Sequence, residues 1–121
     1  MTRYDESKYQ EQVISVLQRY YSHVFFTAGF AGERLDARAA VRRKRMGYRA
    51  GTPDIIVLEA RGGFNGLLIE MKSSTGRQTP EQKDFQKNAE ARGYCYRVCK
   101  STQEGVTAIT EYMDSIQPLT I

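Results

Sequence analysis

Residues 51–72 read GTPDIIVLEARGGFNGLLIEMK, and two short apolar runs within them, 55–58 and 67–69, predict a pair of strands. Each run is rich in Ile, Val and Leu and is short enough for a buried strand. The residues between the runs include Gly62 and Gly63, which favour a turn. Pairing across this turn would make the stretch a β-hairpin, around which the rest of the chain can be arranged.

Charged residues lie at the edge of this hairpin. Asp54 precedes the first run, Glu70 ends the second, and Lys72 follows two residues later. Because side chains alternate between the faces of a strand, Glu70 and Lys72 share one face and Met71 lies on the other. Pairing of the strands would bring Asp54 and Glu70 to the same edge of the sheet. Two carboxylates and an ammonium group would then lie together, as a divalent cation and a phosphodiester require.

The same residues have a purely structural interpretation. Acid–x–Lys triplets are common on strands, and a buried ion pair of Lys72 with Glu70 or Asp54 would need no metal. In the metal interpretation, Lys72 holds or deprotonates the attacking water and offsets charge in the transition state. Gln82 would orient Lys72 or a phosphate oxygen from the start of the next helix. Composition and spacing alone leave both interpretations open.

Size and composition bound the class of protein. The chain has 121 residues, of which 40% are hydrophobic and 26% charged, and we expect one globular domain over residues 1–121. No apolar run approaches the roughly 18 residues of a membrane span, and the N-terminus lacks a signal-peptide pattern. We therefore expect no membrane partner and a location in the cytoplasm of a bacterial cell or a phage-infected host. Cys95 and Cys99 are expected to be reduced structural residues.

Positive charge is concentrated in one segment. Residues 33–52 hold seven Lys/Arg side chains against two acidic ones, an excess of +5, whereas the rest of the chain sums to −1. Arginines recur there every three or four residues, at Arg34, Arg38, Arg42, Arg45 and Arg49. Like charges at this spacing repel one another, so phosphate binding is favoured over a merely solvated helix face. The stripe predicts a DNA-binding surface.

The remaining pattern predicts an α/β fold with a mixed central sheet flanked by helices. Thr79, Pro80 and Gln82 form a helix start with the residues of a capping box, and Gly93 would end that helix. The other expected elements are helix 4–21, strand 23–27, helix 34–46, strands 55–58 and 67–69, strand 94–98 and helix 102–116.

Glu6 breaks the pattern of the first helix. At about 100° per residue it lies roughly 20° from Val13, within the apolar stripe, whereas Glu11 lies roughly 160° away on the solvent face. A carboxylate on the buried side of a helix costs free energy unless it is paired or binds a cation. Alternatively, Glu6 lies in a frayed first turn and only caps the helix. Helix position alone leaves both interpretations open.

Longer sequence motifs favour the metal-site interpretation over the structural ion pair. Pro53-Asp54 followed by Glu70-Met71-Lys72 matches the PD-(D/E)xK nuclease signature. The full set of motifs resembles the virus-type replication-repair nuclease (VRR-NUC) family, in that family's order, from about Glu6 to Gly93. The matching residues are Glu6, Gln10, Val13-Ile14, Gly51-Thr52-Pro53-Asp54, Glu70-x-Lys72 and Thr79-x-x-Gln82.

The resemblance implies a restriction-endonuclease-like fold and a metal-dependent active site. In that family acidic residues bind Mg²⁺ or Mn²⁺, a lysine is catalytic and a glutamine lies in the active site. Carried over, the metal ligands are Glu6, Asp54, Glu70 and the carbonyl oxygen of Met71. The catalytic set adds Lys72 and Gln82 to the three acidic residues. Glu11 is the alternative to Glu6 as the first acidic ligand.

Small stand-alone relatives from phages and bacteria dimerise and cut branched DNA, including four-way junctions. The resemblance therefore implies a homodimeric, structure-selective endodeoxyribonuclease with a role in DNA repair, of the Holliday junction resolvase kind. Two alternatives remain: a general repair or restriction-like endonuclease without branch selectivity, and a DNA-binding module with an inactive site. The intact Asp54, Glu70 and Lys72 argue against the inactive module.

Overall fold

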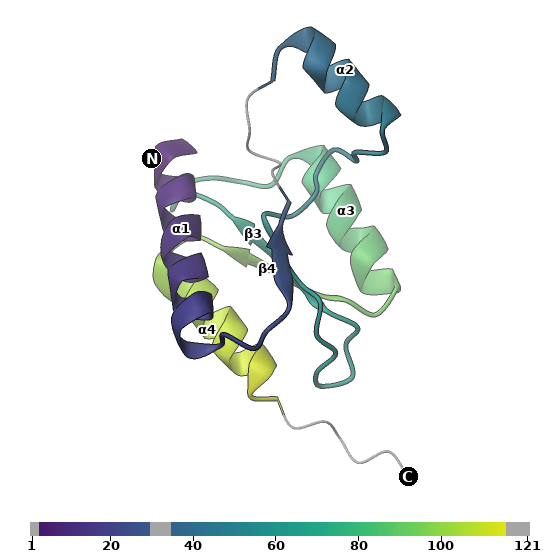
Figure 1. Ribbon diagram of the computed structural model, residues 1–121. Helices are drawn as coiled ribbons and strands as arrows, with labels where there is room; N and C mark the ends of the chain where they lie inside the picture. Colours follow the sequence, from purple (N-terminus) through teal and green to yellow (C-terminus); the bar gives the residue numbers. More distant parts are fainter. Residues whose placement is uncertain (1–2, 30–34, 116–121) are drawn as a thin grey trace.

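A four-stranded sheet runs through the protein (Figure 1). The computed structural model describes residues 3–29 and 35–115. The strands are β1 Phe26–Ala28, β2 Ile55–Val57, β3 Leu67–Met71 and β4 Cys95–Cys99. They lie in the order β1-β2-β3-β4, with β1–β2 and β2–β3 antiparallel and β3–β4 parallel. The predicted mixed sheet is confirmed.

Helices cover both faces of this sheet. They are α1 Arg3–Tyr20, α2 Ala37–Arg45, α3 Pro80–Ala91 and α4 Thr102–Met113. α1 and α4 pack on one face, where Val13 and Ile109 are fully buried in the main core (Figure 1). α3 covers the opposite face, over Leu68 and Tyr96. The sheet is therefore flanked by helices, as the sequence predicts.

The predicted hairpin of β2 and β3 is present. Ile55 lies opposite Ile69, and the Asp54 amide donates a hydrogen bond of 2.9 Å to the Ile69 carbonyl oxygen. Asp54 is thus attached to β3 immediately before β2 begins. Residues of β3 alternate between the two cores, with Ile69 in the main core and Leu68 on the α3 side. This alternation places Glu70 on the α3 side of the sheet.

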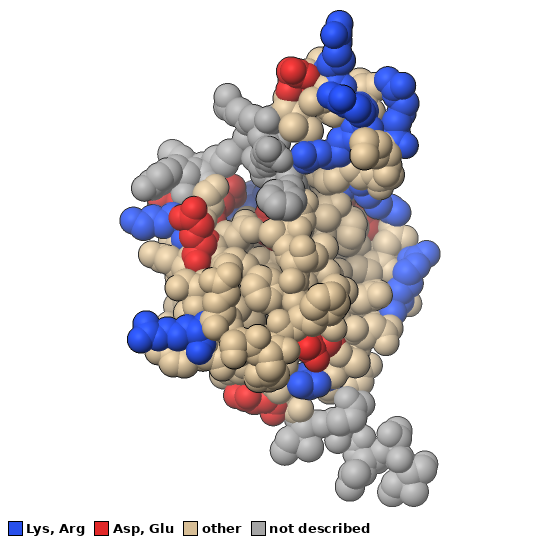
Figure 2. Space-filling model, in the orientation of Figure 1, with Lys and Arg blue, Asp and Glu red and all other residues tan. Residues whose placement is uncertain are grey.

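α2 projects from the rest of the protein, and none of its residues is buried (Figure 1). Asp36 caps it, because its Oδ1 accepts a hydrogen bond of 2.7 Å from the Ala39 amide. Figure 2 shows that Lys and Arg side chains gather over this helix. Ala39, Ala40 and Arg43 are half-buried, and the other residues of the helix are exposed. The basic surface of α2 is accordingly open to a partner.

Some boundaries differ from the expected ones. The strand predicted over 23–27 is wrong in position, because the chain first makes a turn in which the Val24 amide bonds the Tyr21 carbonyl oxygen at 2.9 Å. Val24 is then buried in the core, and pairing starts at Phe26. The helix predicted over 34–46 begins at Ala37, and the last helix, predicted to reach residue 116, ends at Met113 with Asp114 as its C-cap.

No helix in the described part of the chain combines the length and the apolar character needed to cross a membrane. The assignment of residues 1–121 to one domain stays a prediction.

Candidate active site

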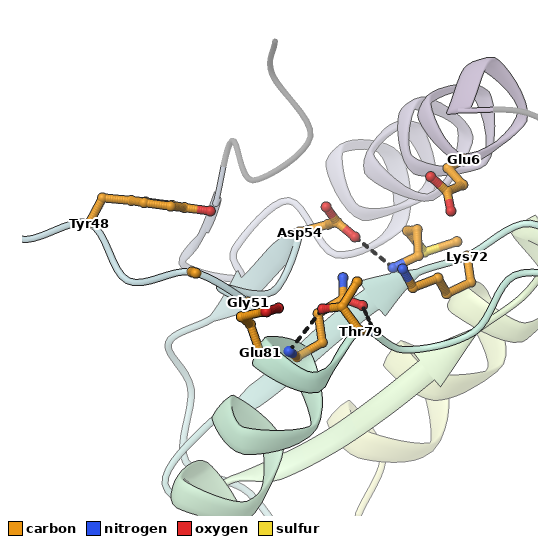
Figure 3. Close-up of a pocket in the computed structure, with 10 residues that line it drawn as sticks. Glu6, Tyr48, Gly51, Asp54, Lys72, Thr79 and Glu81 are labelled. Atoms are coloured by element: carbon orange, nitrogen blue, oxygen red, sulfur yellow. Dashed lines mark hydrogen bonds between the residues drawn. The ribbon is translucent and has the colours of Figure 1, made fainter. Parts of the chain in front are cut away.

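A pocket of about 310 Å³ opens where the edge of the sheet meets α1 and α3 (Figure 3). Glu6 of α1, Asp54 before β2, Lys72 after β3 and Gln82 of α3 all border it. Four of the predicted residues, from segments far apart in the sequence, therefore meet at one cavity. Figure 3 shows Glu6, Asp54 and Lys72 gathered together above the start of α3.

Asp54 is a carboxyl group with an unusual affinity for protons. Its Oδ2 accepts a hydrogen bond of 2.7 Å from the Met71 amide. Burial raises the pKa of Asp54 to about 6, against the opposing effect of the Met71 amide. The negative charges of Glu70 and Glu6 raise this pKa further, and the Lys72 ammonium lowers it. Three carboxylates are thus close enough to repel one another.

Glu70 is almost completely buried, with 1% of its surface exposed. Its Oε1 accepts hydrogen bonds from the Tyr96 hydroxyl at 2.7 Å and from Gln78 Nε2 at 3.3 Å. Its Oε2 has no hydrogen-bond partner among the described residues, although the Lys72 ammonium lies 3.8 Å away. An ionised oxygen in such a position is costly unless a cation compensates it.

Lys72 forms the ion pair that the structural interpretation requires. Its side chain is 12% exposed, and its Nζ lies 3.8 Å from Glu70 Oε2. Charge-assisted hydrogen bonds are shorter, about 2.7–2.9 Å, so this pair is a loose one. The Lys72 amide donates to the Cys99 carbonyl oxygen at 2.8 Å and anchors the end of β3 against β4. The ammonium group is therefore held beside the pocket without being locked to one partner.

Glu6, and not Glu11, is the acidic residue that α1 brings to this pocket. Glu6 is half-buried, and its Oε1 accepts a hydrogen bond of 3.3 Å from the Ser73 amide. Glu11 is exposed and borders a different hollow of the surface. One turn after Glu6, Gln10 donates a hydrogen bond of 3.3 Å from its Nε2 to the Asp54 carbonyl oxygen. α1 is thus tied to both strands of the hairpin at the site.

Gln82 takes part in the predicted capping box of α3. The Thr79 hydroxyl oxygen accepts from the Gln82 amide at 3.2 Å, and Gln82 Oε1 accepts from the Thr79 amide at 2.8 Å. The described structure contains no hydrogen bond between Gln82 and Lys72. Gln82 therefore borders the pocket, but its side-chain oxygen stabilises the helix start instead of orienting Lys72.

Gly51 fixes the loop before Asp54 against α3. Its φ is +86°, and a Cβ built there would lie 2.3 Å from the carbonyl oxygen of Glu81. Only glycine combines this backbone conformation with so close an approach. The contact explains why the loop and the first turn of α3 together line the pocket.

The family model described as the VRR-NUC domain matches residues 5–103. This chain belongs to the VRR-NUC family. It is accordingly a nuclease of the PD-(D/E)xK type, and its predicted fold class is confirmed.

Solved structures agree with the VRR-NUC assignment. One described as a VRR_NUC domain protein is 27% identical, with a TM-score of 0.78 over 93% of this chain and 91% of its own. Another, described as a VRR_NUC domain, is 18% identical, with a TM-score of 0.57 over 89% of this chain and 97% of its own, and shows the fold alone. A search of curated proteins finds no match.

The arginines of the predicted stripe are only partly brought together in this VRR-NUC domain. Arg38, Arg42 and Arg45 are exposed on α2. Arg49 lies in the following loop, where its guanidinium pairs with Asp84 at 3.0 Å. Three of the five arginines of the predicted stripe therefore share α2, whereas the fourth, Arg49, pairs with α3. Arg34 lies outside the described residues.

The VRR-NUC pocket is bordered by the carboxylates of Asp54 and Glu6, which a hard divalent cation prefers as ligands. Glu70 does not line the pocket, but its buried carboxylate lies close enough to Asp54 to raise the pKa of that group. Burial, with a smaller effect of the neighbouring Glu70 and Glu6, raises the pKa of Asp54, and the buried Oε2 of Glu70 has only a loose ion pair with Lys72. Within residues 3–29 and 35–115, however, no three His, Cys, Asp or Glu side chains are already set around one point as a metal cluster. The residues fit a cation in their chemistry.

Tyr96 and Gln78 were missed by sequence reasoning. Both hold Oε1 of Glu70, and Gln78 also donates to Gln86 Oε1 at 2.8 Å. Tyr96 lies on β4 opposite Leu68, on the same side of the sheet as Glu70. Strand alternation could have put Tyr96 on that side, but only once the parallel pairing of β3 and β4 was known.

Proposed function

We propose that this chain is a metal-dependent, structure-selective endodeoxyribonuclease that cuts branched DNA, such as four-way junctions, as a homodimer. The observation that carries the proposal is the buried Oε2 of Glu70, which has no hydrogen-bond partner among the described residues and only a loose ion pair of 3.8 Å with Lys72. A protein built only for stability would rarely keep such an oxygen without compensation.

Asp54, Glu70 and Glu6, with the carbonyl oxygen of Met71, would hold Mg²⁺ or Mn²⁺. When bound, such an ion polarises a phosphoryl oxygen and lowers the pKa of a bound water. The Met71 amide holds one oxygen of Asp54, and Tyr96 and Gln78 hold one oxygen of Glu70. These bonds leave one oxygen of each carboxylate for a ligand bond.

Lys72 has the position of a catalytic residue. Its ammonium group lies beside Glu70 at the edge of the pocket, where it can donate a hydrogen bond to the attacking water or to a phosphoryl oxygen. In that place it offsets negative charge that develops on the phosphate in the transition state. Gln82, whose Oε1 is used by the cap, contributes by fixing the start of α3.

α2 would hold the DNA backbone. None of its residues is buried, it carries Arg38, Arg42 and Arg45, and it projects from the rest of the protein (Figures 1 and 2). Tyr48, three residues after its end, borders the pocket. Arginine side chains on an exposed helix suit phosphate contacts that do not read sequence. A nuclease selective for DNA shape needs contacts of this kind.

Branch selectivity and dimerisation are the finer parts of the proposal. The resemblance to small stand-alone relatives that dimerise and cut branched DNA supports them. A two-fold dimer would present two pockets and two copies of α2 in opposite directions. Action in the cytoplasm of a bacterium or a phage-infected host belongs to the same proposal.

One substrate panel tests these points. Purified protein is incubated with Mg²⁺ or Mn²⁺ and a four-way junction, a flap or a linear duplex, alongside Lys72→Ala and Asp54→Ala. We expect cleavage of the junction by the wild type only. Equal cutting of linear and branched DNA would replace the proposal by a nuclease without branch selectivity. Undiminished activity of Asp54→Ala would contradict the proposed metal site. A protein that sediments as a monomer with junction DNA would contradict the proposed dimer.

A further inference from the structure

Tyr48 stands where two hollows of the surface meet. It borders the catalytic pocket, and it also borders a hollow beside α2 that Arg42, Arg43 and Met46 line. Figure 3 shows Tyr48 across the catalytic pocket from Lys72, with its hydroxyl end directed toward Asp54. It is the aromatic side chain among the residues that line this pocket. The wall opposite Lys72 is therefore an aromatic one.

The end of α2 fixes the place of this ring. Gly47, with φ +104°, lets the chain turn back, so that the Gly47 amide bonds the Lys44 carbonyl oxygen and the Tyr48 amide bonds the Arg43 carbonyl oxygen, both at 3.0 Å. These are the two bonds of a Schellman motif. The Arg43 guanidinium lies 5.6 Å from the centre of the Tyr48 ring, a cation–π distance. The ring is thus held from the side of α2.

If the contact between Arg43 and Tyr48 served only to end α2, Tyr48 would not need to border the catalytic pocket. Tyr20 provides the comparison within the same chain. The Arg19 guanidinium lies 5.7 Å from the Tyr20 ring, yet Tyr20 is 69% exposed and borders none of the pockets described above. The pairing with arginine is therefore common to both tyrosines. Of these two tyrosines, Tyr48 borders the catalytic pocket and Tyr20 does not.

We propose that the Tyr48 ring is a stacking surface for the nucleobase next to the phosphate that is cut. Every nucleobase has a face that stacks on an aromatic ring, without regard to sequence, and a neighbouring guanidinium strengthens such sites. A base can reach Tyr48 only after it leaves the DNA stack. Branch points offer bases that are already poorly stacked, whereas an intact duplex must first be opened. The inference rests on the proposed nuclease function and gives branch selectivity a physical cause.

A double-mutant cycle between protein and DNA tests this stacking. The cut position is first mapped on a four-way junction with the wild type. An abasic site then replaces each flanking nucleotide in turn, and affinity is measured with Mg²⁺ in a Lys72→Ala background, which leaves the DNA intact. Tyr48→Leu removes the ring, Tyr48→Phe keeps it, and Tyr20→Leu is the matched control.

We expect Tyr48→Leu and one of the abasic sites each to weaken binding about tenfold, and the two together to weaken it no further. Tyr48→Phe and Tyr20→Leu should bind the junction like the parent protein. Additive losses, or tenfold weakening by Tyr48→Phe, would overturn the stacking surface. The proposed function has its own test: it fails if the wild type does not prefer the junction to a linear duplex. In that case, the coupling between Tyr48→Leu and the abasic site, measured on the duplex, would still decide whether Tyr48 stacks on a base.

Discussion

The Tyr96 hydroxyl donates a hydrogen bond of 2.7 Å to Oε1 of Glu70, and the two side chains are 2% and 1% exposed. The bond joins β4 to β3 below the catalytic pocket. Because it occupies one carboxylate oxygen, it directs the other, Oε2, toward Lys72. Partners of this kind, which hold a metal ligand without touching the metal, set both its orientation and its affinity.

Tyr96→Phe should therefore weaken metal binding and cleavage by roughly 10- to 100-fold. The expected signature is a higher Mg²⁺ requirement, accompanied by a moderate fall in melting temperature because the buried Oε1 of Glu70 loses a hydrogen bond. Cleavage rates across a Mg²⁺ titration give the measurement. Tyr94→Phe, on the same face of the sheet, serves as the control. An unchanged Mg²⁺ requirement in Tyr96→Phe would mean that this hydroxyl has no part in positioning Glu70.

Asp54 should destabilise the metal-free protein at neutral and alkaline pH. Its pKa is raised from 3.8 to about 6, chiefly by burial, so the folded state favours the protonated form. Stability that this group contributes is present below pH 3.8 and is lost as the pH rises through about 6. Asp54→Asn should thus be more stable than the wild type at pH 8, by about 3 kcal/mol, and lose that advantage below pH 4.

Urea unfolding in EDTA at several pH values measures this difference. Asp114→Asn, which removes an exposed carboxylate, is the control. If Asp54→Asn were no more stable than the wild type at pH 8, the uncompensated charge inferred for the pocket would not exist.

Charge reversal on α2 should weaken DNA binding and flatten its dependence on salt. Arg38→Glu combined with Arg42→Glu removes two phosphate contacts, so the slope of log K against log salt should fall by about 2. Arg19→Glu with Arg92→Glu makes the same change of charge at the ends of α1 and α3. Equal effects of both pairs in a salt titration would show that only net charge matters and would reject α2 as the DNA-binding element.

Gly51→Ala should disturb the site through the backbone. The added Cβ would meet the Glu81 carbonyl oxygen, and a positive φ is strained for alanine. We expect a loss of about 2–3 kcal/mol in stability together with reduced cleavage. Gly63→Ala separates the two causes, because Gly63 has a similar φ of +88° with nothing within 4 Å of its Cβ. Should both variants lose the same stability in denaturant titrations, the contact with α3 would be unimportant.

Much of the site could be predicted because its key residues are local in the sequence. Asp54, Glu70 and Lys72 lie on one hairpin, where alternation along a strand determines which side chains share a face. Gln82 and Thr79 form a capping box that short spacing alone reveals. Contacts between residues that are close in the sequence can be predicted without knowing the tertiary fold.

Contacts between distant segments were the ones that could not be predicted. Tyr96 reaches Glu70 across the parallel pairing of β3 and β4, and Arg49 is not part of the basic stripe because α2 ends at Arg45 and the Arg49 side chain pairs with Asp84 of α3. The first strand was placed too early because a turn at Val24, stabilised by burial in the core, overrides the β propensity of its neighbours. In each case packing against another element decided the outcome.

The central claim is that Asp54 and Glu70 hold a divalent cation, and direct titration with Mn²⁺ tests it most simply. Free Mn²⁺ is followed by electron paramagnetic resonance as the ion is added to the wild type, Asp54→Ala and Glu70→Gln. The account predicts saturable binding to the wild type and at least tenfold weaker binding to both variants. Binding of equal strength in all three proteins, or none in the wild type, would contradict it.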